Sequence, residues 1–234
     1  MIEVFERLET KYLLNEEMYL KLMNVINNHL EKDKYFESNI YNIYFDSNDY
    51  KLIQNSLEKP IYKEKVRLRS YHKPDIDEDV FLEVKKKYNG IVSKRRVSLK
   101  LKDFYEYLRS GVIPKSSSEQ RFKEIDYLFN YYRLEPKLLL AYDRKSYFDK
   151  DNINFRITFD SNIRSNENNF HLEDIKEEKP YFEERMYIME TKVLGGYPKW
   201  FIDALSTLKI YPASFSKYGS IYTKKLKEEL NYVW

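Results

Sequence analysis

Charged and apolar residues alternate along several segments of this 234-residue chain, and this two-residue period constrains the fold more than any other feature. A period of two is typical of β-strands, whose successive side chains point to opposite faces of a sheet. In one segment Lys65, Arg67 and Arg69 share a face, and Val66 and Leu68 lie on the other. Eight or more segments follow this pattern, which predicts a largely antiparallel sheet.

The polar faces of these segments are mostly basic. Together they hold thirteen basic and four acidic residues, whereas the whole chain has 41 basic and 38 acidic residues. The basic members are Arg7, Lys11, Lys65, Arg67, Arg69, Lys85, Lys87, Lys94, Arg96, Arg144, Arg156, Lys192 and Lys217, and the acidic members are Glu9, Glu83, Asp160 and Glu190. Like charges on adjacent strands destabilise a sheet, so a solvated face usually mixes both signs. The excess of basic residues indicates a face that binds a polyanion.

Two arrangements of the sheet are consistent with this pattern. One is an open sheet with a solvated polar face and helices on its apolar face. The other is an α+β fold in which about eight antiparallel strands close into a barrel, with the polar faces inward and helices at the periphery. We expect the closed barrel, because it turns the basic residues into a tunnel. Such a surface suits phosphate, which arginine binds through two hydrogen bonds and lysine neutralises as a compact charge.

Five segments show helical rather than strand periodicity. They begin near Asn15, Lys102, Ser117 (with Gln120 in a capping box), Pro198 and Ser220. The stretch Ser161 to Lys179 is rich in Asn and acidic residues and predicts a surface loop. Because no linker, repeat or low-complexity tract interrupts the pattern, we expect a single domain over residues 1–234.

Composition excludes several functional classes. The chain has no Cys, three His and only five Gly, so disulfides, thiolate metal sites, the P-loop, the Rossmann fingerprint and the serine-hydrolase elbow are all absent. No apolar run is long enough to span a membrane and the start lacks a leader's apolar core, so we expect a cytoplasmic protein with no membrane partner. The net charge of +3 does not favour nucleic acid.

The order and spacing of the polar-face residues resemble those of the VTC domain. This is the catalytic domain of the vacuolar transporter chaperone polyphosphate polymerase, a branch of the triphosphate tunnel metalloenzymes, which include the CYTH proteins and RNA triphosphatases. The resemblance extends from about Glu6 to Tyr218, which is nearly the whole chain. The motifs that carry it are Arg7-x-Glu9-x-Lys11-Tyr12, Lys65-x-Arg67-x-Arg69, Glu83-Val-Lys85, Lys94-x-Arg96, Tyr142-x-Arg144, Arg156, Glu190-x-Lys192 and Ser216-Lys217-Tyr218.

The resemblance implies an enzyme that transfers the γ-phosphoryl group of ATP to inorganic polyphosphate, using Mn²⁺ or Mg²⁺. Together with the strand faces, it assigns catalytic roles to Arg67, Arg69, Arg144, Arg156 and Glu190. Substrate binding is assigned to Arg7, Lys11, Lys65, Lys85, Lys94, Arg96, Tyr142, Lys192, Ser216 and Lys217, and metal binding to Glu190 and Glu9. Hard oxygen ligands suit these ions, and phosphoryl transfer requires positioning and charge neutralisation more than a protein nucleophile.

Several alternatives stay open at this point. Arg7 stands where tunnel hydrolases have a Glu, which weakens a second metal site and favours a polymerase over a tripolyphosphatase or nucleoside triphosphatase of the same fold. A non-catalytic module that binds polyphosphate, inositol phosphates or RNA is a further alternative. Glu190 either holds the metal or pairs with a neighbouring basic residue. Asp46 and Asp49 are attributed to turn formation rather than metal binding, and alternation directs Lys86 to the face opposite Lys85.

Overall fold

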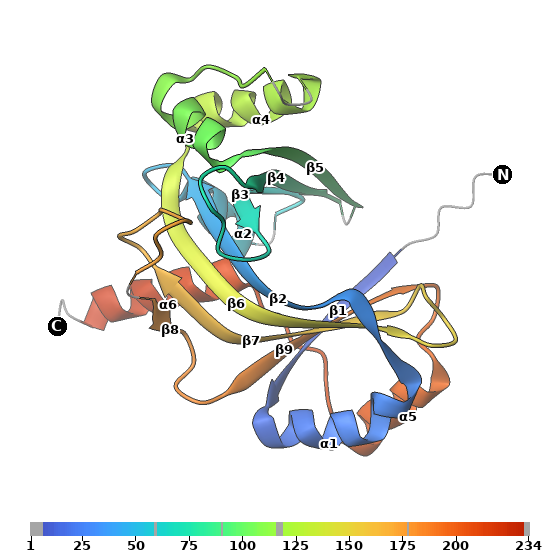
Figure 1. The fold of residues 1–234 in the computed structure, drawn as a ribbon. Helices are drawn as coiled ribbons and strands as arrows, with labels where there is room; N and C mark the ends of the chain where they lie inside the picture. Colours follow the sequence, from blue (N-terminus) through green and yellow to red (C-terminus); the bar gives the residue numbers. More distant parts are fainter. Residues whose placement is uncertain (1–6, 59, 90, 116–118, 177, 232–234) are drawn as a thin grey trace. The chain divides into compact units, whose positions relative to one another are not determined.

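The computed structural model describes residues 7–58, 60–89, 91–115, 119–176 and 178–231. The described strands are β1 Arg7–Asn15, β2 Leu30–Asp46, β3 Tyr62–Ser70, β4 Asp79–Tyr88, β5 Ile91–Lys100, β6 Glu135–Asp149, β7 Arg156–Asn166, β8 Lys179–Pro180 and β9 Met186–Leu194. The helices are α1 Glu16–Ile26, the 3₁₀ turn Asn27–His29, α2 Lys51–Leu57, α3 Leu101–Ser110, α4 Glu119–Tyr132, α5 Lys199–Thr207 and α6 Lys217–Asn231. Figure 1 labels these elements.

The strands form one nine-stranded sheet, and every register pair that is resolved is antiparallel. The hydrogen-bonded order is β1-β9-β7-β6-β2-β3-β4-β5, and β8 pairs with β7. The α+β prediction is confirmed. The prediction of a closed barrel is wrong for the described residues, because β1 and β5 are the two ends of the strand order and do not pair with each other.

The chain divides into two compact units. Unit 1 contains Met1–Asn39, Tyr142–Ile163 and Pro180–Ser216, and unit 2 contains Ile40–Ala141, Arg164–Lys179 and Lys217–Trp234. Each unit has its own hydrophobic core. The single domain over residues 1–234 stays a prediction.

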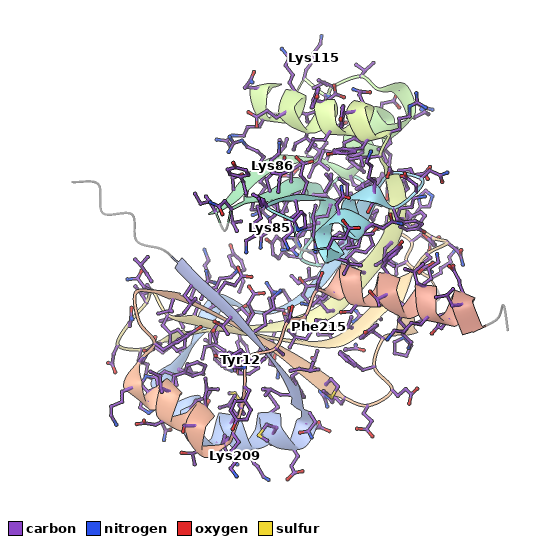
Figure 2. All side chains as sticks on the ribbon, turned by 180° about the vertical axis from the view of Figure 1, so that it is seen from behind. Tyr12, Lys85, Lys86, Lys115, Lys209 and Phe215 are labelled. Carbon is purple, nitrogen blue, oxygen red and sulfur yellow. The ribbon has the colours of Figure 1, made fainter. Side chains whose placement is uncertain are left out.

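In unit 1, helices α1 and α5 cover the apolar face of β1, β9 and β7 (Figure 1). Tyr12 of β1 points to this side (Figure 2) and its ring lies edge-on to that of Phe201 in α5. The predicted helix start is confirmed, because Asn15 caps α1 by accepting a hydrogen bond from the backbone N–H of Met18 (2.8 Å). Packing on one face leaves the other face of these strands to polar side chains.

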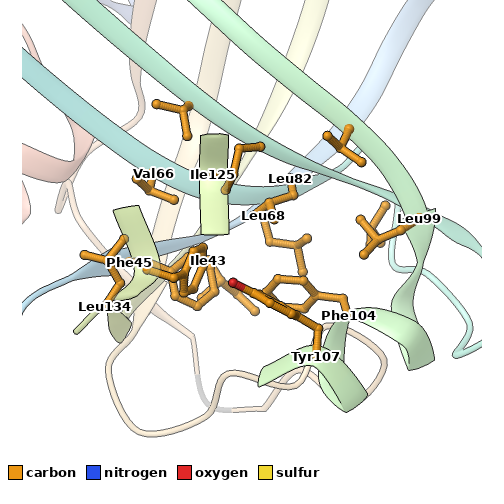
Figure 3. Packing of buried hydrophobic residues seen from close by; sticks show 14 of the residues in the cluster. Ile43, Phe45, Val66, Leu68, Leu82, Leu99, Phe104, Tyr107, Ile125 and Leu134 are labelled. Atoms are coloured by element: carbon orange, nitrogen blue, oxygen red, sulfur yellow. The ribbon is translucent and has the colours of Figure 1, made fainter. Parts of the chain in front are cut away.

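In unit 2, α3 and α4 cover the apolar face of β3, β4 and β5. Figure 3 shows Phe104 and Tyr107 of α3 beside strand residues such as Leu68 and Leu82, all of them buried. Gly111 ends α3 with a left-handed backbone conformation (φ 72°) that costs little without a Cβ. The alternation predicted for β3 is confirmed, because Val66 and Leu68 enter this core while Arg67 lies on the opposite face.

The segment after β2 forms a helix that the sequence reasoning did not anticipate. The carboxylate of Asp46 accepts hydrogen bonds from the backbone N–H groups of Ser47, Leu52 and Ile53, which starts α2. Asp46 also accepts a hydrogen bond from the Tyr218 hydroxyl of α6 (3.0 Å). The assignment of Asp46 to local backbone structure is therefore confirmed.

The segment predicted as a loop from Ser161 is partly a strand, because β7 continues to Asn166. The capping role predicted for Ser117 lies outside the described residues. Within the described residues, the helices are too short or too polar to cross a membrane.

Candidate phosphate-binding faces

The polar face of unit 2 is built from rows of side chains that lie opposite one another on β2, β3, β4 and β5. In the first row Tyr44 lies opposite Arg67, Arg67 opposite Glu83, and Glu83 opposite Arg96. The antiparallel register thus places one carboxylate between two guanidinium groups. Side chains in such directly opposed positions are close enough to interact.

Glu83 is the centre of this row. One carboxylate oxygen, Oε2, accepts from Nε of Arg67 (2.9 Å) and lies 2.8 Å from its Nη2. The other oxygen, Oε1, lies 2.5 Å from the Lys94 ammonium and 3.2 Å from Nε of Arg96. Glu83 is only 1% exposed. Burial opposes its charge, but the surrounding cations outweigh burial and lower the pKa of Glu83 to about 2.

The neighbouring rows are rich in lysine, although the outer one ends at Val92 on β5. Lys65 lies opposite Lys85, and Lys85 opposite Lys94. Beyond them, Lys63 lies opposite Lys87. On the other side of the first row, Arg69 donates a hydrogen bond from Nε to Oδ1 of Asn42 (2.8 Å). Like charges in directly opposed positions repel, so this arrangement favours a bound polyanion.

The positive potential of this face also acts on two tyrosines. Burial alone would raise the pKa of Tyr44, but the charges of Arg67 and Arg69 outweigh burial and lower it to about 8. Burial likewise opposes ionisation of Tyr71, yet the guanidinium groups of Arg69 and Arg96 lower the pKa of this phenol as well. Both shifts have the sign expected where the potential favours negative charge.

The polar face of unit 1 has a different character, because its cations are matched by carboxylates. Across β1, β9 and β7, Glu9 lies opposite Lys192, which lies opposite Arg156. In the next row, Lys11 lies opposite Glu190. The Arg156 guanidinium is paired with the carboxylate of Asp33.

Arg144 and Asp160 form the most deeply buried charge pair of unit 1. Nε of Arg144 donates to Oδ1 of Asp160 (2.6 Å), and Nη2 donates to Oδ2 (2.8 Å). Burial opposes the charge of Arg144, but Asp160 outweighs it and raises the pKa of the guanidinium further. The Arg144 guanidinium also lies near the Tyr142 ring, 5.4 Å from its centroid.

Glu190 is held between two lysines. Its Oε1 lies 2.8 Å from Nζ of Lys192, and its Oε2 lies 3.9 Å from Nζ of Lys11. Burial opposes ionisation, but Lys192 and Lys11 outweigh burial and lower the pKa of Glu190 to about 2. The side chain of Glu190 is therefore ionised at neutral pH. The ion pairing of Glu190 with neighbouring basic residues, which was the alternative to metal binding, is present.

The chemistry of these carboxylates fits a divalent cation in part. Lys192 lies within 3.9 Å of an oxygen of Glu9 as well as close to Glu190, so both carboxylates share one ammonium. Mg²⁺ is usually bound by one or two carboxylates, with waters and substrate phosphates completing its ligands. Glu9 and Glu190 suit such a site. In the described part of the chain, no group of three or more His, Asp or Glu forms an all-protein cage.

The predicted site residues thus form two sets, each within its own unit. Unit 2 brings together Lys65, Arg67, Arg69, Lys85, Lys94 and Arg96, and unit 1 brings together Glu9, Lys11, Tyr142, Arg144, Arg156, Glu190 and Lys192. Arg7 begins β1, but its side chain lies outside the described part of the structure. Ser216 ends unit 1, and Lys217 is the first residue of α6.

Sequence reasoning missed several residues that hold the predicted arginines. Asn42 and Tyr44 could have been found, because they share the two-residue spacing of the polar face on β2. Asp33 had no local signal, since it meets Arg156 from a distant part of the sequence. The Tyr218 ring stacks on Tyr44, with centroids 4.8 Å apart.

Comparisons with known proteins agree with the fold. A solved structure from Bacillus halodurans, described as a candidate adenylate cyclase, is 14% identical; the match covers 89% of this chain and 92% of that one, with a TM-score of 0.53. PH1819 of Pyrococcus horikoshii is 13% identical, with 94% and 99% covered and a TM-score of 0.47. A candidate adenylate cyclase from Vibrio parahaemolyticus is 11% identical, with 93% and 98% covered and a TM-score of 0.46. The last two scores are too low to support an argument.

No protein with a curated description matches the chain. The sequence profile of the VTC domain, however, matches residues 6–224, which include parts of both units. This match confirms the resemblance seen in the order of the charged motifs. The chain belongs to the VTC domain family.

Proposed function

We propose that this protein is a polyphosphate polymerase. A terminal phosphate oxygen of inorganic polyphosphate attacks the γ-phosphorus of ATP, the bond from that phosphorus to the β,γ-bridging oxygen breaks, and the electron pair leaves with ADP. The chain grows by one phosphate. Membership of the VTC domain family supports a reaction of this class, and phosphoryl transfer of this kind depends on positioning and charge neutralisation.

The observation that carries the proposal is the lysine row of unit 2. Lys65, Lys85 and Lys94 are directly opposed on three adjacent strands, next to a row in which Arg67 and Arg96 flank one carboxylate. A sheet face that served only to contact water would gain stability by mixing charges. A polyphosphate chain repeats negative charge along its length, so it matches the excess of cations over the carboxylate of Glu83 in these two rows.

The arginines are suited to orient phosphate oxygens because their own geometry is fixed. Arg67 is held by Glu83, Arg69 by Asn42, and Arg144 by Asp160. A guanidinium has five N–H donors in a rigid planar fork that matches the geometry of phosphate oxygens. We assign Arg67 and Arg69 of unit 2, and Arg144 and Arg156 of unit 1, to neutralising phosphoryl oxygens.

The remaining predicted residues take supporting roles. Lys11, Lys192, Ser216 and Lys217 bind and orient phosphates, and Tyr142 supports Arg144. Glu190 and Glu9 hold Mn²⁺ or Mg²⁺, which when bound neutralises phosphate charge and polarises the transferred group. The low pKa of Glu190 supports this role, because a metal ligand must be deprotonated.

Product analysis tests the proposal. The protein is incubated with ATP, Mn²⁺ and a short polyphosphate primer, and the products are separated by length. A polymerase releases one ADP for each phosphate that it adds to the chains. Release of free phosphate in place of longer chains would identify a triphosphatase, and binding without any turnover would identify a non-catalytic phosphate-binding module; either result would overturn the proposal.

A further inference from the structure

Tyr44 occupies an unusual position on the polar face of unit 2. It lies on β2 directly opposite Arg67, and its side chain is almost fully buried. Its hydroxyl oxygen accepts a hydrogen bond from Nη1 of Arg67 (3.3 Å), while Nε and Nη2 of the same guanidinium contact Glu83. Arg67 is therefore held from two sides, by a carboxylate and by a phenol.

The phenol is packed on its other side by α6. The rings of Tyr44 and Tyr218 stack with an interplanar angle of 23°, and the Tyr218 hydroxyl donates its hydrogen to Asp46. The hydroxyl hydrogen of Tyr218 is therefore directed to Asp46 and not to Tyr44. On β2 itself, Nδ2 of Asn42 donates to the backbone carbonyl of Leu140 on β6, which fixes the adjacent part of the strand.

The charged groups that face Tyr44 come mainly from β3. Lys65, Arg67 and Arg69 favour the ionised phenolate and outweigh burial, so the pKa of Tyr44 is about 8 rather than the ordinary value near 10. From β4, Glu83 acts on the same guanidinium. From α6, Lys217 begins the helix that carries Tyr218, and from the end of β2, Asp46 binds the Tyr218 hydroxyl.

We propose that Tyr44 is a positioning residue for phosphate binding that acts through Arg67 and depends on its own proton. This inference rests on the proposed phosphate-binding function. The neutral phenol accepts one hydrogen bond from Arg67 and adds no charge to the basic face. The phenolate instead forms an ion pair with Arg67 and adds a negative charge to the face that receives the polyanion.

Ionisation of Tyr44 and binding of a polyanion must then oppose each other. By reciprocal linkage, a bound polyanion raises the pKa of Tyr44, and a rise in pH through the free pKa weakens polyanion binding. Below about pH 7 Tyr44 is neutral in the free and bound protein, so it contributes no pH dependence there. At pH 9 the expected loss of affinity due to Tyr44 is roughly tenfold, one pH unit above the free pKa.

The test is calorimetric titration of the full chain with inorganic tripolyphosphate between pH 6.5 and 9. The wild type is compared with Tyr44→Phe, which keeps the ring but cannot ionise, and with Tyr211→Phe, a control at an exposed tyrosine of unit 1. The titration of tripolyphosphate itself affects all three proteins equally. Between pH 6.5 and pH 9, we expect the wild type and Tyr211→Phe each to lose roughly ten times more affinity for tripolyphosphate than Tyr44→Phe loses.

A second measurement requires no variant. Tyrosinate absorbance of the wild type at pH 8.5 should fall when tripolyphosphate is added, because the bound anion returns the proton to Tyr44. Failure of the wild type to bind tripolyphosphate at pH 6.5 would refute the proposed function itself. Binding at pH 6.5 with the same pH profile in wild type and Tyr44→Phe, or with unchanged tyrosinate absorbance, would overturn the role of Tyr44 and leave the proposed function standing.

Discussion

The guanidinium of Arg144 is bound to Asp160 at two points, with Nε 2.6 Å from Oδ1 and Nη2 2.8 Å from Oδ2. Asp160 is fully buried and the side chain of Arg144 is 18% exposed, so the pair fixes the direction in which the arginine presents its remaining donors. In unit 2, Arg67 is also held at two points, but its Nε and Nη2 both contact the same oxygen, Oε2 of Glu83. Such fixed charges neutralise a developing negative charge without the cost of reorienting.

Arg144→Lys tests whether this fixed geometry matters beyond the charge. Lysine keeps the positive charge but cannot bind both carboxylate oxygens in the planar fashion of arginine. We expect kcat/KM for ATP and polyphosphate to fall about 30-fold or more, equivalent to at least ~2 kcal/mol of transition-state stabilisation. Arg185→Lys, at an exposed arginine of the same unit, is the control. Equal activity of the two variants would show that Arg144 contributes only charge.

Glu190→Gln separates binding from chemistry. The pKa of Glu190 is about 2, so the substitution removes a full negative charge at neutral pH while it keeps the shape of the side chain. If Glu190 holds the metal, metal-dependent turnover should fall by orders of magnitude, and polyphosphate binding without metal should persist or tighten. Product formation and calorimetric binding are both measured.

The exposed Glu183 provides the matched control for this experiment, as Glu183→Gln removes a charge elsewhere in unit 1. Retained metal-dependent turnover in Glu190→Gln would favour the alternative in which Glu190 only pairs with Lys192 and Lys11.

Lys86 shows how far alternation predicts the role of a residue. It lies on the face opposite Lys85, as expected, and Figure 2 labels both residues on β4. Its ammonium, however, lies 3.6 Å from Oε1 of the buried Glu64. We expect Lys86→Ala to leave phosphate binding unchanged but to destabilise the fold by about 1 to 3 kcal/mol, because Glu64 loses a partner.

The pH dependence of this loss follows from Glu64. Burial outweighs Lys86 and raises the pKa of Glu64 above its ordinary value. A carboxyl with a raised pKa stabilises the fold below its ordinary pKa, and this contribution disappears as pH rises through the folded-state value. Removing Lys86 raises the pKa further, so thermal unfolding should show a larger deficit at pH 8 than at pH 4. The double variant Glu64→Gln/Lys86→Ala should lose this pH dependence; if it does not, the pair is not the cause.

The faces of the strands could be predicted from the sequence, and the closure of the sheet could not. Alternation around Val66 and Leu68 is local, so it correctly separated the core side of β3 from its polar side. Barrel closure requires a ladder between β1 and β5, which no local pattern encodes. The basic polar face led to the barrel prediction, although an open sheet carries the same side chains.

The arginines of the candidate site could be predicted, but most of the groups that hold them could not. Arg67 and Arg144 stood out through their spacing and through the family resemblance. Asp33, which pairs with Arg156, lies far away in the sequence, so only the folded structure reveals it. Tyr44 was hidden among 23 tyrosines, most of which we attributed to packing, and its lowered pKa depends on charges from the neighbouring strand.

Thermal unfolding in tripolyphosphate tests the central claim most directly, namely that the lysine rows of unit 2 bind phosphate. A ligand that binds only the folded state stabilises it by about 2.7 kcal/mol at one hundred times its Kd. The wild type should therefore gain more in Tm from tripolyphosphate than from chloride at matched ionic strength. Lys85→Gln should lose much of this gain, and Lys227→Gln, at an exposed lysine of α6, should keep it. Equal gains from both salts, or the same gain in all three proteins, would contradict the account.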